Sequence, residues 1–179
     1  MTASRRFGDV VIECTRGDIA VQPDIDAVVN AANAQLAPGA GVAGAIHRAA
    51  GPGLYDECKP LAPIATGDAV ITSGHGLPSP WCIHVLGPVY ASSPDPSGEL
   101  ASCYLQALER AEERGLASVA TPAVSTGVFG YPVAEAARVA LTTVASLAPG
   151  LRTIKLVRFV LWDERDLTIH EMALEELVE

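Results

Sequence analysis

The sequence predicts an α/β layer fold. Short apolar runs alternate with segments of helical periodicity, and two glycine-rich turns each follow an expected strand and precede an expected helix. A chain of 179 residues that is 49% hydrophobic can bury one well-formed core and is short for two. We therefore expect residues 1–179 to form a single domain.

The first half of the chain is expected to supply four strands and two helices. The strand patterns occupy residues 9–14, 27–32, 68–74 and 81–87, the last two paired around the turn HGLPSP. Helical patterns occupy residues 42–51, which close on Gly51, and residues 54–62, which end at a proline.

The second half is expected to supply three helices and two strands. Asp95-Pro96 begins a helix over 97–114, which ends before Gly115 and carries an apolar face of Leu100, Tyr104, Leu108 and Ala111. The remaining elements are a buried strand over 117–124, a helix over 132–147 opened by Pro132, a strand over 154–162 and an amphipathic helix over 166–179. The Pro- and Ser-rich segment 90–99 is expected to be a surface loop.

Charge and cysteine content narrow the function. The formal net charge of −9 gives no general basic surface, which argues against binding of duplex nucleic acid and requires that any anionic ligand be held locally. The four cysteines are far apart and form no C-x-x-C pair, so we expect reduced, packed thiols and no metal site. No apolar run is long enough for a membrane span, and we expect a cytoplasmic protein that binds no membrane.

The two glycine-rich turns are the main functional signal. VVNAANAQLAPGAGVAGAIHRAAG (28–51) and STGVFGYP (125–132) both deliver the chain from a strand into a helix. In an open α/β sheet, ligands bind at the carboxyl ends of the strands, where glycine allows close approach of the backbone and helix N-termini attract anions. The turns therefore predict a site that binds a phosphate or diphosphate group.

A nicotinamide-dependent oxidoreductase is the first alternative, because residues 39–44 contain the pattern G-x-G-x-x-G. The fit is poor. In a dinucleotide-binding unit the first glycine follows the strand at once and an acidic residue ends the next strand, whereas here eight residues separate Asn30 from Gly39 and a proline-rich helical piece follows Gly51.

The chain resembles the macrodomain family, in particular its MacroD-type branch. The resemblance covers nearly the whole chain, with matching segments in order and register: GDI (17–19), VVNAAN (28–33), GVAGAIHRAAGP (41–52), GDAVIT (67–72), IHVLGP (83–88) and TPAVSTGVFGYP (121–132). It implies a mixed central sheet sandwiched between helices, with a cleft for ADP-ribose or a conjugate of it and no cofactor.

The resemblance also implies roles for individual residues. Asp18 and the backbone of Ile19 would bind the adenine edge, Trp162 would lie near the adenine, and Asn33 and Phe129 would position the distal ribose for catalysis. Backbone groups would hold the diphosphate, at Gly41, Val42 and Gly44 in the first turn and at Ser125, Thr126, Gly127, Val128, Phe129 and Gly130 in the second.

Structural roles compete with these. Asp18 could only initiate a turn, Phe129 could belong to the core, and Asn30 is expected to tie loop backbone together. We assign no chemistry to the histidines: His47, His84 and His170 are expected to be structural, and His75 to lie in a solvated loop.

The main departure from the family is Ala43, which stands where hydrolytic MacroD-type relatives carry an aspartate implicated in positioning or activating water. Pro38 and Ala40 also replace glycines of the usual loop. Two function classes remain, with a cleft for another nucleotide diphosphate metabolite as a third possibility. The chain is expected to bind ADP-ribose and remove it from acidic side chains, or to deacylate O-acyl-ADP-ribose, and the alternative is a non-catalytic ADP-ribose reader. The physiological target and the oligomeric state stay open.

Overall fold

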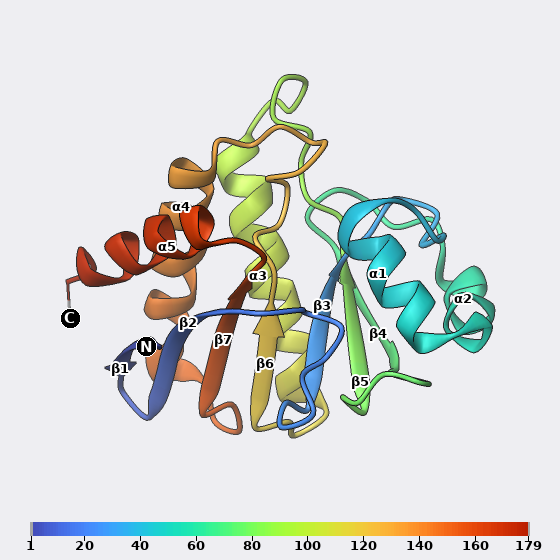
Figure 1. Ribbon diagram of the computed structural model, residues 1–179, viewed down its shortest axis with the longest axis horizontal. Coiled ribbons are helices and arrows are strands. Elements are labelled where there is room, and N and C mark those ends of the chain that lie inside the picture. Colours follow the sequence, from blue (N-terminus) through green and yellow to red (C-terminus); the bar gives the residue numbers. More distant parts are fainter. Residues whose placement is uncertain (1, 179) are drawn as a thin grey trace.

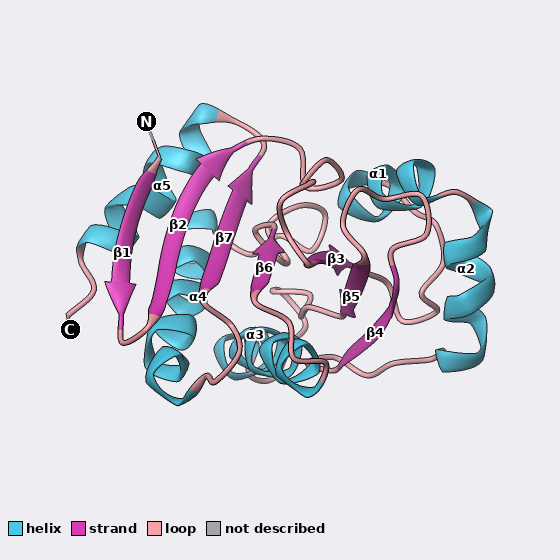
Figure 2. Cartoon of the chain, turned by 90° about the horizontal axis from the view of Figure 1, so that it is seen from below, coloured by secondary structure: helices cyan, strands magenta, loops and turns pink. Residues whose placement is uncertain are grey.

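A seven-stranded mixed sheet organises the chain in the computed structural model, which describes residues 2–178 (Figure 1). The strands lie in the order β1-β2-β7-β6-β3-β5-β4. Their bounds are β1 Ala3–Phe7, β2 Val10–Arg16, β3 Ala27–Ala31, β4 Ala69–Ser73, β5 Trp81–Val85, β6 Ser118–Thr121 and β7 Leu156–Leu161. The five inner strands are parallel, and β1 and β4 pair antiparallel at the two edges (Figure 2).

Helices cover both faces of the sheet. Their bounds are α1 Gly41–Ala50, α2 Pro52–Cys58, α3 Pro96–Glu113, α4 Val133–Leu147 and α5 Glu164–Glu175, with short 3-10 turns at Lys59–Leu61 and Ala148–Gly150. Helices α1 and α2 lie beside the β5 and β4 end of the sheet, and α5 lies beside β1 and β2 (Figure 1).

Alternating side chains of the inner strands feed two separate hydrophobic clusters. On β3, Ala27 and Val29 pack in the cluster that contains residues of α3, α4 and α5, whereas Val28 packs in the cluster that contains residues of α1 and α2. On β7, Phe159 packs in the first of these clusters and Val160 in the second. This alternation is expected for parallel strands buried on both faces, and it confirms the predicted sandwich.

The predicted elements are found with shifted ends, and one strand was not predicted. β1 was missed because ASRRF carries two arginines and little apolar surface, as suits an edge strand. The helix predicted over 54–62 is instead α2 followed by a 3-10 turn, and the loop predicted over 90–99 ends where α3 begins, at Pro96. Of the helix predicted over 166–179, residue 179 lies outside the described residues.

The topology creates a crevice between β3 and β6. These parallel neighbours end at the same edge of the sheet, and the helices that follow them, α1 and α4, pack with opposite clusters. Because the two helices lie on opposite faces of the sheet, the loops that lead to them separate at this edge. A ligand in an open α/β sheet usually binds at such a point. We call residues 32–40 loop 1 and residues 122–132 loop 2.

No helix among residues 2–178 is both long enough and apolar enough to cross a membrane.

Candidate functional site

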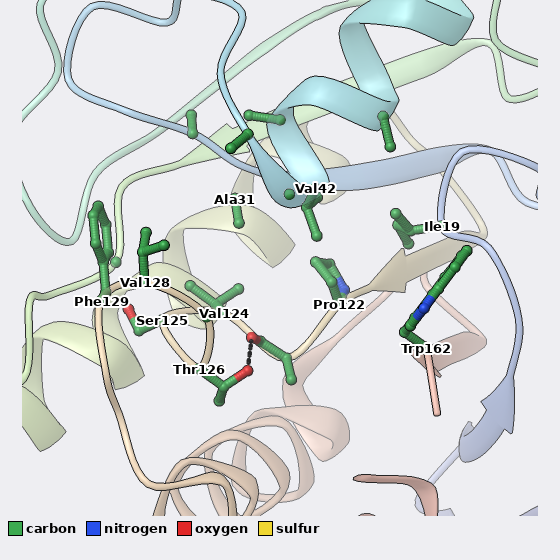
Figure 3. Close-up of a pocket in the computed structure, with 18 of the residues that line it drawn as sticks. Ile19, Ala31, Val42, Pro122, Val124, Ser125, Thr126, Val128, Phe129 and Trp162 are labelled. Atoms are coloured by element: carbon green, nitrogen blue, oxygen red, sulfur yellow. Dashed lines mark hydrogen bonds between the residues drawn. The ribbon is translucent and has the colours of Figure 1, made fainter. Parts of the chain in front are cut away.

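A cleft of about 660 Å³ opens at this edge of the sheet, within the range of small-molecule sites. Four strands deliver residues to it where they end: Asp18 and Ile19 follow β2, loop 1 follows β3, loop 2 follows β6, and Trp162 follows β7. Figure 3 shows Trp162 and Ile19 at one end of the cleft and Phe129 and Val128 at the other.

The first turn of α1 enters the cleft with its backbone donors unused. The N-cap residue is Ala40, which offers no side-chain oxygen, and the first turn carries no acidic residue. Gly41, Val42 and Ala43 line the cleft, and within residues 2–178 no hydrogen bond engages their N–H groups. Unpaired N–H groups and the positive end of the helix dipole make this a binding position for an anion.

Loop 1 is held by the side chain of Asn33. Its Oδ1 accepts a hydrogen bond from the Ala37 N–H at 3.0 Å, and its Nδ2 donates to the Ala37 carbonyl at 2.9 Å. One N–H of the amide is left, and Asn33 also lines the cleft. The residue predicted to position the distal ribose therefore also fixes the loop in which it lies.

Loop 2 is held mainly by its own backbone. The Tyr131 N–H donates to the Ser125 carbonyl and the Gly130 N–H donates to the Gly127 carbonyl. One side chain contributes, since Thr126 Oγ1 donates to the Ala123 carbonyl at 2.8 Å (Figure 3). The N–H groups of Gly127, Val128 and Phe129 have no partner among the described residues. Three successive free donors thus lie opposite the first turn of α1.

Ser125 is the most unusual residue of loop 2. It is buried, its φ of 67° is in the left-handed region that non-glycine residues rarely adopt, and its Oγ has no hydrogen-bond partner in the described part of the chain. A Cβ at Gly87 would overlap that oxygen, so the loop after β5 needs glycine there. Backbone strain of this kind costs about 1–3 kcal/mol and is concentrated at functional sites.

The end of the cleft at Trp162 carries an exposed ring and a carboxylate. Trp162 is 74% exposed, and it lines the cleft. Asp18 is half-buried, and its Oδ1 accepts from the Ala20 N–H at 2.9 Å. The turn role weighed for Asp18 is therefore present, but it occupies one carboxylate oxygen only.

Phe129 and Ala43 define the other end. Phe129 is half-buried and packs against the α1 and α2 cluster while it lines the cleft, so the core role and the ligand-facing role coexist. Ala43 is 6% exposed, and its Cβ lies 3.9 Å from the position that a Cβ at Gly39 would take. Position 43 therefore lies beside loop 1 and also lines the cleft.

The predicted binding residues line the cleft with two exceptions, Gly44 and Gly130. The Gly44 N–H donates to the Ala40 carbonyl, and a Cβ at Gly44 would overlap the Gly39 carbonyl oxygen. Gly130, at a φ of 73°, completes the turn of loop 2. Neither glycine lines the cleft, and both shape the segments that do.

Asn30 differs from expectation. Its side chain is fully buried and does not tie loop backbone: Nδ2 lies 3.0 Å from His84 Nδ1, and His84 Nε2 lies 2.9 Å from Thr72 Oγ1. Burial, with a smaller effect of His47, lowers the pKa of His84 to about 3. A neutral imidazole with its proton on Nε2 satisfies both contacts of the ring, because Thr72 Oγ1 in turn donates to the Ser73 carbonyl, whereas Asn30 Oδ1 has no hydrogen-bond partner among the described residues. The network supports the strand below loop 1.

The other histidines are placed as expected with one addition. His47 and His170 are buried on α1 and α5, and burial lowers the pKa of each. His75 lies in the loop between β4 and β5, but its Nε2 lies 2.7 Å from Glu57 Oε1. The four cysteines are buried and unbridged, as predicted. Among residues 2–178, no cluster of three or more His, Cys, Asp or Glu side chains could hold a metal ion.

Two charged residues of the cleft were not predicted, Arg48 and Asp166. Both lie on exposed or half-exposed helix positions, where a charged side chain is normally solvated, so the sequence pattern contains no signal for them. Together with Asp18 they are the charged residues of the lining. Arg48 is the one cation among them.

Comparison with known proteins agrees with the geometry. The family model described as Macro domain matches residues 29–140. A macro domain-containing protein of Chlorobaculum tepidum is 44% identical over 167 residues, which cover 93% of this chain and 96% of that protein. The ADP-ribose glycohydrolase MACROD2 of Xenopus laevis is 44% identical over 164 residues, which cover 90% of this chain and 39% of that longer protein.

The fold has a close match among solved structures. The Oceanobacillus iheyensis macrodomain with ADP superposes with a TM-score of 0.93 at 39% identity, and the match covers 98% of this chain and 95% of that one. The resemblance found in the sequence is thereby confirmed, and the chain belongs to the macro domain family.

Proposed function

We propose that the cleft binds ADP-ribose and that the chain hydrolyses the ester that joins ADP-ribose to an acidic protein side chain, or to the acyl group of O-acyl-ADP-ribose. The observation that carries the proposal is the pair of unused donor sets, at the first turn of α1 and at residues 127–129, which face one cleft. A diphosphate carries anionic oxygens on two phosphate groups and could accept from both donor sets. The names and bound ADP of the relatives support the same ligand.

The adenine is assigned to the end of the cleft at Trp162. The Asp18 oxygen that does not bond to Ala20 would accept from the exocyclic amine, Ile19 would offer its backbone, and the exposed Trp162 ring would pack near the base. Asp18→Asn tests this part. It keeps an acceptor for the Ala20 N–H but offers an N–H to the base in some orientations, so ADP-ribose affinity should fall about 10-fold while stability is retained.

The distal ribose is assigned to the end at Asn33 and Phe129. The spare amide N–H of Asn33 would bond to the sugar or to the attacking water, and Phe129 would press on the ring. Both are positioning roles. Phe129→Ala should therefore lower the single-turnover rate more than it lowers ADP-ribose affinity.

Hydrolysis is proposed even though Ala43 supplies no general base. The ester at the anomeric carbon is an activated linkage, and a general base is typically worth about 10²- to 10⁴-fold in rate, so its loss slows the reaction without removing the other contributions. Backbone groups, Asn33 and a phosphate oxygen of the substrate remain to orient water. We therefore expect slow but measurable turnover.

A non-catalytic reader is the second candidate, and Ala43 is the observation that favours it. One assay separates the two. The chain is mixed in excess with a peptide mono-ADP-ribosylated on glutamate, and released ADP-ribose is followed over time. Release above the spontaneous rate, abolished by Gly41→Glu, supports the hydrolase. No release alongside micromolar ADP-ribose binding would reject it and leave the reader.

A further inference from the structure

Arg48 is the single cation among the described residues that line the cleft. Within residues 2–178 no side-chain hydrogen bond or ion pair engages its guanidinium, whereas the half-buried Arg158 is paired with Glu13 and Asp24. The chain contains 21 acidic residues and has a net charge of −9. An arginine without a partner at the rim of a ligand cleft is therefore available to an anion.

The guanidinium of Arg48 lies at the loop 1 side of the cleft. Its side chain folds back along α1, so that Nη1 lies 3.0 Å from the position that a Cβ at Gly44 would take. The hypothetical Cβ at Gly44 would also overlap the carbonyl oxygen of Gly39 in loop 1. Gly39 is itself close to Asn33, because a Cβ at Gly39 would lie 3.6 Å from Asn33 Nδ2. Arg48 thus lies beside loop 1 near Gly39, which lines the cleft next to Asn33, one of the residues assigned to the distal ribose.

We propose that Arg48 recognises the carboxylate that is esterified to the distal ribose and stabilises it as it leaves. This inference rests on the proposed function. In the reaction, a water oxygen bonds to the anomeric carbon, the bond between that carbon and the ester oxygen breaks with its electron pair on the carboxylate, and a water proton passes to solvent. A guanidinium matches a carboxylate with two parallel N–H donors and loses no charge at neutral pH.

The charge of the protein makes this contact useful. Negative charge that develops on a leaving carboxylate is unfavourable near a chain of net charge −9, and free ADP-ribose lacks the carboxylate altogether. Arg48 should therefore act on the rate of release and on the esterified substrate, and not on the affinity for free ADP-ribose. A role on the diphosphate would affect both quantities, because the diphosphate is present in both ligands.

The test compares Arg48→Met, Arg48→Lys and Arg48→Ala with a matched control, Arg6→Met, which removes one exposed, unpaired charge from the opposite edge of the sheet. Single-turnover release from the glutamate-linked peptide and calorimetry with free ADP-ribose are measured for each. Arg48→Met should release ADP-ribose about 10- to 100-fold more slowly, the usual effect of losing a hydrogen bond to a charged group. Its ADP-ribose affinity should match that of Arg6→Met.

Two further results separate a chemical role from a structural one. Arg48→Lys should recover part of the rate, and added guanidinium chloride, but not the same concentration of sodium chloride, should accelerate Arg48→Ala. An unchanged rate in Arg48→Met would overturn the inference, and so would a fall in ADP-ribose affinity equal to the fall in rate. Absence of release by the wild-type chain would instead remove the hydrolase itself, together with the role of Arg48.

Discussion

Loop 1 and loop 2 end neighbouring parallel strands and face the same cleft, but they are built in different ways. Loop 1 depends on one side chain, since Asn33 makes two hydrogen bonds to Ala37. Loop 2 depends on backbone bonds and on left-handed residues at Ser125 and Gly130. Free N–H groups point toward the cleft from loop 2 and from the first turn of α1, which follows loop 1.

This difference indicates in which loop a side-chain substitution can alter the reaction. The donors of loop 2 are held mainly by backbone hydrogen bonds, so they depend on the conformation of the loop more than on the chemistry of its side chains. In loop 1 a side chain holds the loop shape, and in the first turn of α1 the resemblance implies that Ala43 replaces an aspartate of the hydrolytic relatives, so we expect side chains there to set the reaction. Binding should therefore be robust in this chain, and the rate of turnover should be the property that varies.

The largest expected effect comes from filling the cleft at the start of α1. Gly41 has open space around its missing Cβ and a φ of 60°. Gly41→Glu places a carboxylate beside the donors meant for the diphosphate, and ADP-ribose affinity should fall at least about 100-fold. Gly150→Glu, equally open but outside the cleft, is the control. Retained micromolar binding by Gly41→Glu would remove α1 from the site.

The second prediction concerns the side-chain hydrogen bonds that hold the two loops. Asn33→Ala loses two side-chain hydrogen bonds and should lower the free energy of unfolding by about 2–3 kcal/mol, whereas Thr126→Val loses one and should lower it by about 1 kcal/mol. Urea unfolding measures both. Equal losses would show that the contrast between the loops is not one of stability.

The third prediction concerns the pH dependence of stability, which should arise beneath loop 1 and not beneath loop 2. β3, below loop 1, is bonded through Asn30 to His84, whose pKa falls from 6.5 to about 3 in the folded chain, whereas β6 carries no ionisable side chain. The unfolded chain protonates this histidine first as the pH falls below 6.5. Stability from a neutral His84 is therefore complete above that pH and is lost below it, by about 2 kcal/mol between pH 7 and pH 5.

The measurement is urea unfolding across that range for the wild-type chain and for His84→Gln. The other groups with shifted pKa values, including His47 and His170, contribute to both proteins. The wild-type chain should accordingly show the steeper loss of stability. Identical pH dependence in the two proteins would show that His84 does not titrate in this way.

The smallest expected effect compares two cleft glycines. Gly41→Ala should destabilise the chain by about 1–2 kcal/mol, because a Cβ is unfavourable at a φ of 60°, whereas Gly127, which is outside the left-handed region, should tolerate alanine within about 0.5 kcal/mol. Thermal unfolding compares the two. The reverse order would contradict the assigned backbone conformations.

Most of the fold could be predicted from hydrophobic periodicity, because strands buried on both faces and amphipathic helices leave strong local patterns. β1 could not be predicted, since an edge strand with two arginines gains its stability from pairing with β2, which the local pattern does not contain. The ends of α2 likewise depend on a 3-10 turn that its composition does not reveal.

The site could be predicted in outline only. The glycine pattern and the order of the elements indicated the two loops, but not the contacts made between distant residues. Asn30 meets His84 across 54 positions of sequence, and Arg48 reaches the cleft because its side chain folds back along α1. Asn33 both holds loop 1 through hydrogen bonds and lines the cleft, and this double role is visible only in the folded structure.

The most direct test of the central claim is titration of the ¹⁵N-labelled chain with ADP-ribose, followed by amide NMR. Saturable shifts are expected at about micromolar Kd, about −8 kcal/mol, for the amides of residues 41–43 and 127–129 together, because one diphosphate uses both donor sets. Ribose without phosphate should leave these amides unchanged. Shifts confined to one loop, or no shifts at millimolar ligand, would contradict a diphosphate held between the two loops.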